Sequence, residues 1–400
     1  MARLRLGKPT APFRCFCGPG LRAGLGRKNV AYLGSIVSPG TEQRFLAQML
    51  LKTLPSRSSL PRRIGYPAMN GVGLVRWCTR RAVWGVLERF PIRPSLIVIN
   101  YHRVGSPDAT PFDSGVYTVT PQQLAEHADF LANHYDIVDL EGAIRAISAR
   151  QSPRRGAVLI TFDDGYRDNY DLALPILAGR GIPATFFLVS SFVGSSTLPW
   201  WDSVAYVIKH ARRQHFTLKY PAATTVDLAA EPVSAAVRRV LYMYRTAPEM
   251  EHERFMAELE QACDQSRPVA ADRQFLDWDE AAKLVAGGMT IGSHSHTHRL
   301  MGRLPVSEQL DEAVLSRQII AAHLGAEPKS YAYPVGRLTA FTPASMDAVR
   351  RAGYQIAFSF CGGVNRAGQH AFDLRRLDAG VTPDIDSFRA RLAVASSLGR

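Results

Sequence analysis

The pattern of apolar and polar positions changes abruptly along this chain. Residues 1–68 show little hydrophobic periodicity and are rich in Arg, Gly, Pro and Ser, which predicts a disordered leader. From Val72 to Phe90, large apolar residues recur at helical spacing beside several arginines, which predicts a basic amphipathic helix within residues 69–93. Regular alternation begins only after that, and we therefore assign residues 94–392 to one larger domain.

Short apolar runs alternate with helical patterns through this larger domain. Pro94–Val104 and Ala157–Phe162 are nearly continuous apolar segments, as expected of strands that are buried on both faces. Such alternation predicts an α/β fold with a parallel sheet. It breaks between about residues 195 and 277, where the pattern is helical with little strand character. We predict a helical insertion there, over the end of the sheet.

One later helix has a clear apolar side in the sequence. The pattern predicts a helix over Pro305–Leu324, with Leu310, Val314, Ile319 and Ile320 on the buried side. Trp200 and Trp201 lie in the predicted insertion, and two interpretations of them are equally open. They could belong to a core, or their ring faces could stack on a bound ligand.

The strand Ala157–Phe162 ends on two adjacent carboxylates, Asp163 and Asp164, followed by Gly165. Adjacent carboxylates repel each other unless a metal or an arginine offsets their charge. If the strand continued, the two side chains would point to opposite sides, so that one could bind a cation and the other face a reacting water. The alternative is an acidic turn that caps the next helix.

Three histidines follow another apolar segment. His294 and His298 are four residues apart, so one turn of helix, or a tight loop entering it, would bring both rings together at metal-ligand spacing. His296 does not share that spacing. A solvated loop and a His-rich metal tract acting alone are alternatives. Together with the Asp pair, the spacing favours a catalytic metal whose ligands leave positions open for water.

These two motifs carry a family resemblance. Thr161–Gly165 and His294–His298 resemble the first two motifs of the polysaccharide deacetylases, also called the NodB-homology domain or carbohydrate esterase family 4. The flanking segments resemble the exopolysaccharide-type members as well: Tyr166–Tyr170, Pro183–Phe187, Leu276–Trp278 and Tyr331–Gly336. The resemblance covers about Ser95 to Leu392. It implies a distorted (β/α)7 barrel of the NodB-homology type.

The activity that the resemblance implies is hydrolytic removal of N-acetyl groups from N-acetylglucosamine-containing oligo- or polysaccharide, as in chitooligosaccharide and exopolysaccharide deacetylases. Asp164, His294 and His298 would hold a divalent metal, and Asp163 would be the catalytic base. Zinc suits this ligand set best, although nickel or cobalt would also fit.

The sequence departs from the family pattern at the turn after Ser330. Family members often carry an arginine there that orients the catalytic Asp, but this chain has Ala332 instead. Val335 occupies a tyrosine position whose backbone amide holds the oxyanion, and a backbone amide survives the substitution. Of Arg375 and Arg376 on a late strand, one must point inward, and we expect Arg376 to support Asp163.

The catalytic acid also has an unusual place in the chain. Similar deacetylases supply it from a Leu-x-His motif at the end of their last strand, and no such motif follows Arg376. The first buried strand of this domain instead ends on Ile99–His102. The resemblance is therefore to a circularly permuted domain of the poly-N-acetylglucosamine deacetylase type, with His102 as the general acid.

Charge and composition bear on which partners and which location we expect for the protein. Of the 48 Lys and Arg residues, 17 lie in residues 1–93 beside only Glu42 and Glu88, whereas the remainder carries 31 basic and 33 acidic residues. The domain is therefore nearly neutral, which argues against a nucleic-acid partner. Neither a secretory signal nor a membrane-spanning run is evident, so we expect a cytoplasmic or peripheral membrane protein. Residues 72–90 are the candidate membrane contact, and packing on the domain is an equal alternative.

Three other functions stay open at this point. A related amidohydrolase acting on a non-sugar C–N amide bond would keep the same metal site. A non-catalytic carbohydrate-binding protein would have a broken ligand set, and this set is complete. A membrane-surface protein would rely on the amphipathic helix alone.

Overall fold

The computed structural model describes residues 94–108, 110–150, 156–247, 250–268, 272–381 and 384–398. All of them belong to one compact unit, which is assigned to residues 66–400. The predicted leader at 1–68 and the predicted amphipathic helix at 69–93 lie outside the described residues, so both stay predictions. None of the described helices is long and apolar enough to cross a membrane.

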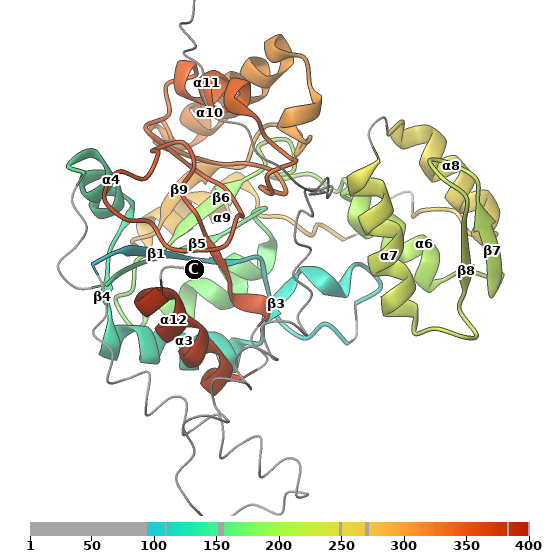
Figure 1. The fold of residues 1–400 in the computed structure, drawn as a ribbon, viewed down its shortest axis with the longest axis horizontal. Coiled ribbons are helices and arrows are strands. Elements are labelled where there is room, and N and C mark those ends of the chain that lie inside the picture. The colour runs from blue at the N-terminus through green and yellow to red at the C-terminus, as the bar shows by residue number, and fades with distance from the viewer. Residues whose placement is uncertain are drawn as a thin grey trace, which may run out of the picture. The chain divides into compact units, whose positions relative to one another are not determined.

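A curled parallel sheet forms the centre of the domain (Figure 1). Its strand order is β11-β10-β9-β6-β5-β1-β12, and β4 pairs with β5 outside that path. The strands are β1 (Leu96–Tyr101), β4 (Asp136–Ile137), β5 (Ala157–Phe162), β6 (Thr185–Leu188), β9 (Thr290–Ser293), β10 (Ser330–Ala332), β11 (Ile356–Phe358) and β12 (Leu377–Asp378). Every recorded pairing within this sheet is parallel, as the near-continuous apolar runs predict.

One late segment bridges the two edges of this sheet. Leu374 forms a parallel bridge with Phe358 of β11, and β12 pairs with β1 only a few residues later. The chain from Leu374 to Asp378 therefore contacts both edge strands and curls the sheet into a distorted barrel. The predicted α/β fold with a barrel-like parallel sheet is confirmed.

Strand alternation sorts the side chains into an outer and an inner layer. Ile97, Ile99 and Tyr101 of β1 pack in the large core cluster with the surrounding helices, whereas Leu96 and Val98 belong to a separate cluster inside the curl. That inner cluster includes Leu159, Phe187, Ala332, Phe358 and Leu374. The next inward positions, towards the carboxyl ends of the strands, are polar. The apolar filling thus ends where the candidate site begins.

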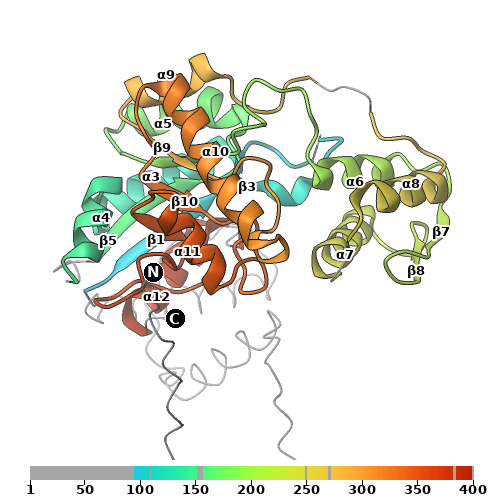
Figure 2. The same cartoon turned by 90° about the horizontal axis from the view of Figure 1, so that it is seen from above.

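Helices surround the sheet (Figures 1 and 2). They are α3 (Pro121–His134), α4 (Leu140–Ser148), α5 (Leu174–Ala178), α9 (Trp278–Ala286), α10 (Val306–Leu324), α11 (Pro343–Arg351) and α12 (Ile385–Leu398). Local sequence explains several helix starts, because Thr120, Asp277 and Thr342 each form a capping box with the residue three positions on. A small parallel pair, β2 (Arg103–Val104) and β3 (Tyr117–Val119), lies beyond the end of β1.

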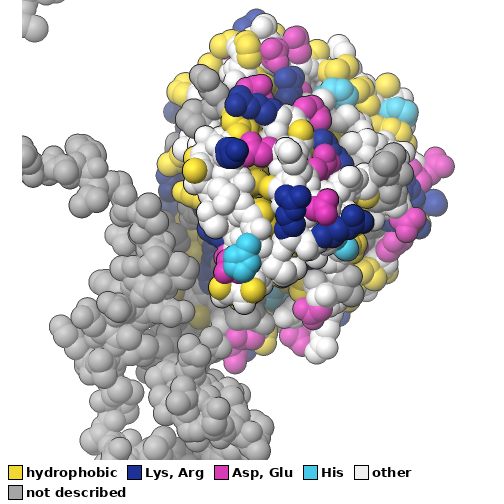
Figure 3. All heavy atoms as spheres, turned by 90° about the vertical axis from the view of Figure 1, so that its right-hand side faces the viewer, with side chains coloured by type: hydrophobic (Ala, Val, Ile, Leu, Met, Phe, Trp, Pro, Cys, Tyr) yellow, Lys and Arg dark blue, Asp and Glu magenta, His cyan; other side chains and the backbone are white. Residues whose placement is uncertain are grey.

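The predicted insertion forms a subdomain with its own core, on the right of Figure 1. It contains α6 (Trp200–Lys209), α7 (Val233–Thr246) and α8 (His252–Cys263). It also contains an antiparallel hairpin of β7 (His215–Leu218) and β8 (Thr224–Asp227), which the helical prediction omitted. The alternating burial of Phe216 and Leu218 explains this hairpin, whose short strands pack against the helices. On the face shown in Figure 3, basic and acidic side chains are interspersed.

Candidate active site

The candidate residues meet in one cavity at the carboxyl ends of the parallel strands. The cavity has a volume of about 360 Å³. Its lining includes all seven residues singled out from the sequence: His102, Asp163, Asp164, His294, His298, Val335 and Arg376. They come from the ends of β1, β5, β9 and β12 and from the turn after β10. Parallel α/β barrels collect their chemistry at this end of the sheet.

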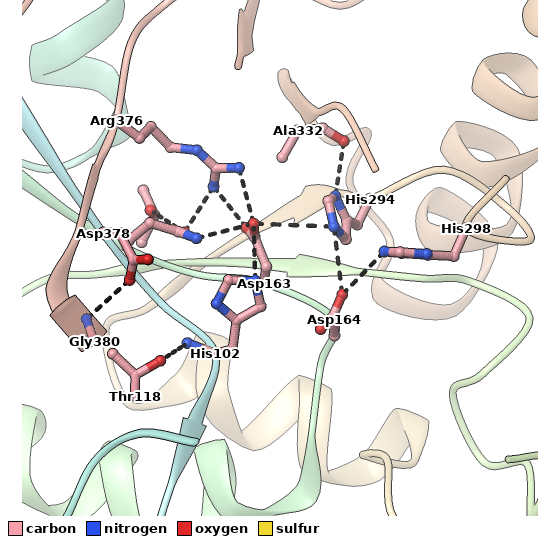
Figure 4. Close-up of polar contacts among 12 residues, drawn as sticks. His102, Thr118, Asp163, Asp164, His294, His298, Ala332, Arg376, Asp378 and Gly380 are labelled. Atoms are coloured by element: carbon pink, nitrogen blue, oxygen red, sulfur yellow. Dashed lines mark hydrogen bonds and ion pairs between the residues drawn. The ribbon is translucent and has the colours of Figure 1, made fainter. Parts of the chain in front are cut away.

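Three buried donor atoms converge at one side of the cavity (Figure 4). Oδ1 of Asp164 lies 3.4 Å from Nε2 of His294 and 3.4 Å from Nε2 of His298. The three ligand atoms lie within 4.8 Å of one another. Ligands at about 2.0–2.1 Å from a tetrahedral zinc ion are about 3.3–3.4 Å apart, so the two Asp–His separations fit such an ion.

The hydrogen bonding of these residues also fits a cation. Nδ1 of His294 lies 2.8 Å from the carbonyl oxygen of Ala332, which can only accept, so Nδ1 carries the proton and Nε2 presents a lone pair. Oδ1 of Asp164 is buried and has no hydrogen-bond partner among the described residues. Two lone pairs facing each other in a buried site repel, and a divalent cation between them removes that repulsion. The residues present therefore fit a divalent metal.

The pKa values of Asp164, His294 and His298 reflect both their burial and their mutual charges. Burial alone would raise the pKa of Asp164, but the two histidines outweigh it and hold that pKa well below its usual value. Burial lowers the pKa of His298. At His294 the nearby Asp163 and Asp164 outweigh burial and raise the pKa. The carboxylates thus create a field that favours positive charge between the donors.

The second carboxylate has a different partner. Both oxygens of Asp163 accept hydrogen bonds from Arg376, from Nη1 at 2.7 Å and from Nη2 at 2.8 Å, and Oδ2 also accepts one from Nδ2 of Asn100 at 3.1 Å (Figure 4). Asp163 and Arg376 are both at least 98% buried. Burial would raise the pKa of Asp163, but the charge of Arg376 prevails and lowers it. Asp163 is therefore held ionised and in one orientation.

His102 lies on the opposite side of Asp163 from the metal ligands (Figure 4). Its Nε2 is 3.9 Å from Oδ2 of Asp163, and its side chain is 26% exposed. Its backbone is held at both ends: the amide donates to Oγ1 of Thr118, and the carbonyl accepts from Nδ2 of Asn169. The ring can therefore reach the cavity from a fixed backbone. The circular permutation itself stays a prediction.

Backbone strain concentrates around this cavity. Six described non-glycine residues have left-handed φ values, and four of them are Asp164, Ser295, His298 and Val335. Such conformations cost about 1–3 kcal/mol each and persist only when the surroundings enforce them. After Asp164, Gly165 also has a positive φ, and a Cβ there would lie 2.7 Å from Leu188. The turn that aims Asp164 therefore requires glycine.

The left-handed turn also corrects one expectation from the sequence. A continued strand would have sent Asp163 and Asp164 to opposite sides, but β5 ends at Phe162 and the φ of Asp164 is 73°. Strand alternation no longer applies beyond that point. Both carboxylates consequently line the same cavity and are distinguished by their partners.

The histidine segment is a loop, held by a glutamate on α10. Glu312 accepts hydrogen bonds from the amides of His296 and Thr297 at 2.9 and 2.8 Å. Glu312 is buried, and the buried face of α10 therefore differs from the apolar face predicted from the sequence. The buried face consists of Gln309, Glu312, Ala313, Ser316 and Ile320, whereas Leu310, Val314 and Ile319 are only partly buried. Leu310 and Val314 still pack against the core, as predicted, but the most deeply buried positions of the helix are largely polar ones that face the loop.

Two supporting residues were not recognised from the sequence, Glu312 and Asn100. Asn100 links the centre of the site, because its Oδ1 accepts from Arg376 and Thr161 while its Nδ2 donates to Asp163. The sequence signal that could have identified Asn100 was a polar residue inside an otherwise apolar strand. His296 lies outside the triad, with Nδ1 2.9 Å from Oγ of Ser190.

The two tryptophans of the insertion have different environments. Trp201 is buried, donates from Nε1 to the Tyr166 hydroxyl at 2.8 Å, and packs against His298 with ring centroids 4.6 Å apart. Nδ1 of His298 has no hydrogen-bond partner among the described residues, so ring packing holds this imidazole. Trp200 is partly buried, stacks on Tyr244 and lines the cavity. Both tryptophans line the cavity, but the deeper burial and the contacts of Trp201 fit a structural role for that residue.

Residues 150–357 match the model of the polysaccharide deacetylase family. This match covers half of the chain, and the chain therefore belongs to the polysaccharide deacetylase family.

Individual relatives align over shorter parts. YxkH of Bacillus subtilis is 31% identical over 100 residues, which are 25% of this chain and 33% of that protein. The poly-beta-1,6-N-acetyl-D-glucosamine N-deacetylase of Staphylococcus epidermidis is 32% identical over 114 residues, 26% of this chain and 38% of the relative. The alignments thus span about a third of each relative's length. The structure of IcaB from Ammonifex degensii superposes with a TM-score of 0.49 at 21% identity, covering 76% of this chain and 99% of that one.

We predict that Asp164→Asn, His294→Ala and His298→Ala each lose the bound metal, because each removes one of three converging donors. His296→Ala should keep it, since its ring faces Ser190. Elemental analysis of the purified variants measures the metal per chain. Metal loss in the His296 variant together with retention in the His294 variant would contradict the assignment.

We predict that Arg376→Met destabilises the metal-free protein by about 3–5 kcal/mol at pH 7, because it leaves Asp163 buried without its cation. In the wild type, the stability from this pair is present above the usual carboxyl pKa and is lost as pH falls through the lowered one. In the variant, Asp163 is buried without this cation, so its pKa rises and protonation relieves the cost as pH falls. The variant's deficit should therefore shrink between pH 7 and 4.5, where the wild-type pair still contributes in full. Urea unfolding at both pH values measures it, and Arg375→Met is the control, since Arg375 is exposed.

We predict that Trp201→Ala weakens zinc binding about 10- to 100-fold, as is typical when the support of a ligand is removed. Trp200→Ala is the matched control, because Trp200 contacts Trp201 but has no recorded ring contact with His298. Competition with a chromogenic chelator gives both affinities. Equal affinities in the two variants would show that Trp201 does not position His298.

Proposed function

We propose that this protein is a metal-dependent hydrolase that removes N-acetyl groups from N-acetylglucosamine-containing oligo- or polysaccharide. The observation that carries the proposal is the pairing, in one cavity, of a buried Asp164–His294–His298 ligand set with a separately held carboxylate, Asp163. Family membership supports the reaction class. The name of the Staphylococcus epidermidis relative supports the choice of sugar.

Asp164, His294 and His298 would hold the metal, and zinc suits a carboxylate and two imidazoles best, with nickel or cobalt as alternatives. When bound, the metal would supply Lewis-acid chemistry that polarises the acetyl carbonyl and lowers the pKa of a water towards about 7.

Asp163 would accept the proton of the attacking water. The interaction with Arg376 keeps Asp163 ionised but lowers its basicity. That combination suits a water whose pKa is already lowered, because the group that accepts its proton then needs correct placement more than high basicity. Arg376 and Asn100 hold Asp163 in place by donating hydrogen bonds to its carboxylate.

The remaining steps would use Val335 and His102. Val335 has a left-handed φ of 61° and lines the cavity, and its amide has no recorded acceptor among the described residues, which leaves it available to an oxyanion. His102 would donate its proton to the departing sugar amine. Hydrolysis then yields acetate and the free amine. Asp163 has gained one proton from the water, and His102 has given one proton to the amine.

The direct test of the function is acetate release from chitooligosaccharides and poly-N-acetylglucosamine, with and without added zinc. We expect zinc-dependent release of acetate that is lost on chelation. A metal-loaded protein that releases no acetate from either substrate, but hydrolyses a non-sugar acetamide, would establish the related amidohydrolase instead.

We predict that His102→Ala lowers turnover about 10²- to 10⁴-fold while leaving metal content and folding intact, as expected for the loss of a general acid. His370→Ala is the control, because His370 lies in a loop, is exposed and does not line the cavity. Steady-state kinetics with parallel metal analysis measures both. Near-normal turnover in the His102 variant would refute its role.

A further inference from the structure

Two arginines at the mouth of the cavity have no role in the chemistry described above. Arg245 lies in the last turn of α7, and Arg337 lies in the turn after Val335, and both side chains line the same cavity as the metal ligands. Of the three cavity-lining arginines, Arg376 is committed to Asp163. Among the described residues, no carboxylate forms an ion pair with either Arg245 or Arg337.

Arg337 is close to the reacting groups. It follows Val335 by two residues, so their α-carbons are at most about 7 Å apart. Its guanidinium carbon lies 5.5 Å from the centre of the Phe360 ring, and the His102 ring lies edge-on to the same ring at 6.0 Å. Arg337 and His102 thus flank one aromatic side chain. An anion bound by Arg337 would lie beside the sugar whose amide is cleaved.

Arg245 approaches from the insertion. Its carbonyl accepts a hydrogen bond from Arg303, which fixes the end of α7 next to the histidine loop. The side chain reaches solvent, but the surrounding protein lowers the pKa of its guanidinium; Asp113 opposes this effect and Arg337 adds to it. Both cations line one cavity, so an anion bound there would interact favourably with two positive charges.

Two other carboxylates of the same cavity are oriented by their own turns. Asp113 accepts a hydrogen bond from the amide of Gly115 at 2.8 Å, and Asp378 accepts one from the amide of Gly380 at 2.9 Å. The charge of Asp113 acts on Arg245, but among the described residues neither carboxylate forms a recorded ion pair with Arg245 or Arg337. Both guanidinium groups therefore keep planar donors of the kind that bind carboxylate and phosphate oxygens in a bidentate manner.

Building on the proposed deacetylase function, we propose that Arg245 and Arg337 form an anion-binding subsite and that the substrate is an acidic polysaccharide. Its N-acetyl sugar carries, or is linked to a sugar that carries, a carboxylate or a phosphate. Trp200, which lines the cavity together with Arg245, offers an apolar surface for the neighbouring sugar ring.

Three substrates of equal length test this proposal. They are an oligosaccharide that alternates uronate with N-acetylglucosamine, an N-acetylglucosamine oligosaccharide linked through phosphodiesters, and a neutral chitooligosaccharide. In low salt, kcat/KM should be at least about 10-fold higher for one acidic substrate than for the neutral one, as expected from one charge-assisted contact. The preference should decline in 0.5 M salt, roughly five times the concentration at which the Debye length is ~10 Å. Which acidic substrate prevails identifies the source of the charge.

Variants assign the preference to the two arginines. Arg245→Gln and Arg337→Gln should each lower the ratio of acidic to neutral kcat/KM about 10-fold, and Arg337→Glu should invert it. Arg351→Gln, an exposed arginine of α11 outside the cavity, should leave the ratio unchanged. Calorimetric binding of the same oligosaccharides to the zinc-loaded protein gives the comparison independently of turnover.

Each outcome is decisive. Acetate release that is equal for neutral and acidic substrates, or a ratio that both Gln variants leave intact, overturns the subsite and leaves the deacetylase function standing. If no substrate releases acetate, the proposed function fails. Arginine-dependent binding of the acidic oligosaccharides would in that case still support the subsite, and equal binding of all three would refute it.

Discussion

The site depends on how two adjacent buried carboxylates are neutralised. Asp163 and Asp164 follow one another at the end of β5, and both are nearly inaccessible to solvent. Two such charges cannot persist side by side without cations, and the protein provides a separate solution for each. Arg376 permanently neutralises Asp163, whereas Asp164 faces two imidazole lone pairs that require a cation from outside. This difference in partners is the physical basis for the separate roles proposed for the two carboxylates.

Supporting contacts keep these two carboxylates distinct. The left-handed turn at Asp164 directs its side chain towards the histidines, and Glu312 holds the loop on which those histidines lie. Asn100 links Arg376 to Asp163 and prevents either from rotating alone. Strain at the turn and hydrogen bonds around it thus act together, since a strained residue remains in place only when its neighbours leave it no other arrangement.

Much of the fold was predictable, because buried parallel strands have a distinctive pattern. The apolar runs at Leu96–Tyr101 and Ala157–Phe162 form β1 and β5, and the motif at the end of each run lines the cavity. Strand alternation also predicted that one of Arg375 and Arg376 would point inward, without deciding which. These features depend on local sequence and on the regular geometry of a strand.

The remaining features depend on tertiary contacts that local pattern does not encode. Glu312 is one of two glutamates on α10, and its burial depends on the adjoining histidine loop. The β7–β8 hairpin is short and gains its stability from packing on the insertion's helices. The common direction of Asp163 and Asp164 arises from a left-handed residue where a continued strand was expected. In each case a non-local contact overrode a sound local expectation.

The pairing of Asp163 with Arg376 also has a consequence for the order of events during synthesis. The two residues are separated by 213 positions, so the carboxylate emerges from the ribosome long before the guanidinium that neutralises it. A contact of such high sequence separation must close a long loop before it stabilises anything. Until β12 joins β1, the nascent chain holds an uncompensated charge at the centre of its future core. Asp163 thus gains its Arg376 partner only after nearly the whole chain has been synthesised.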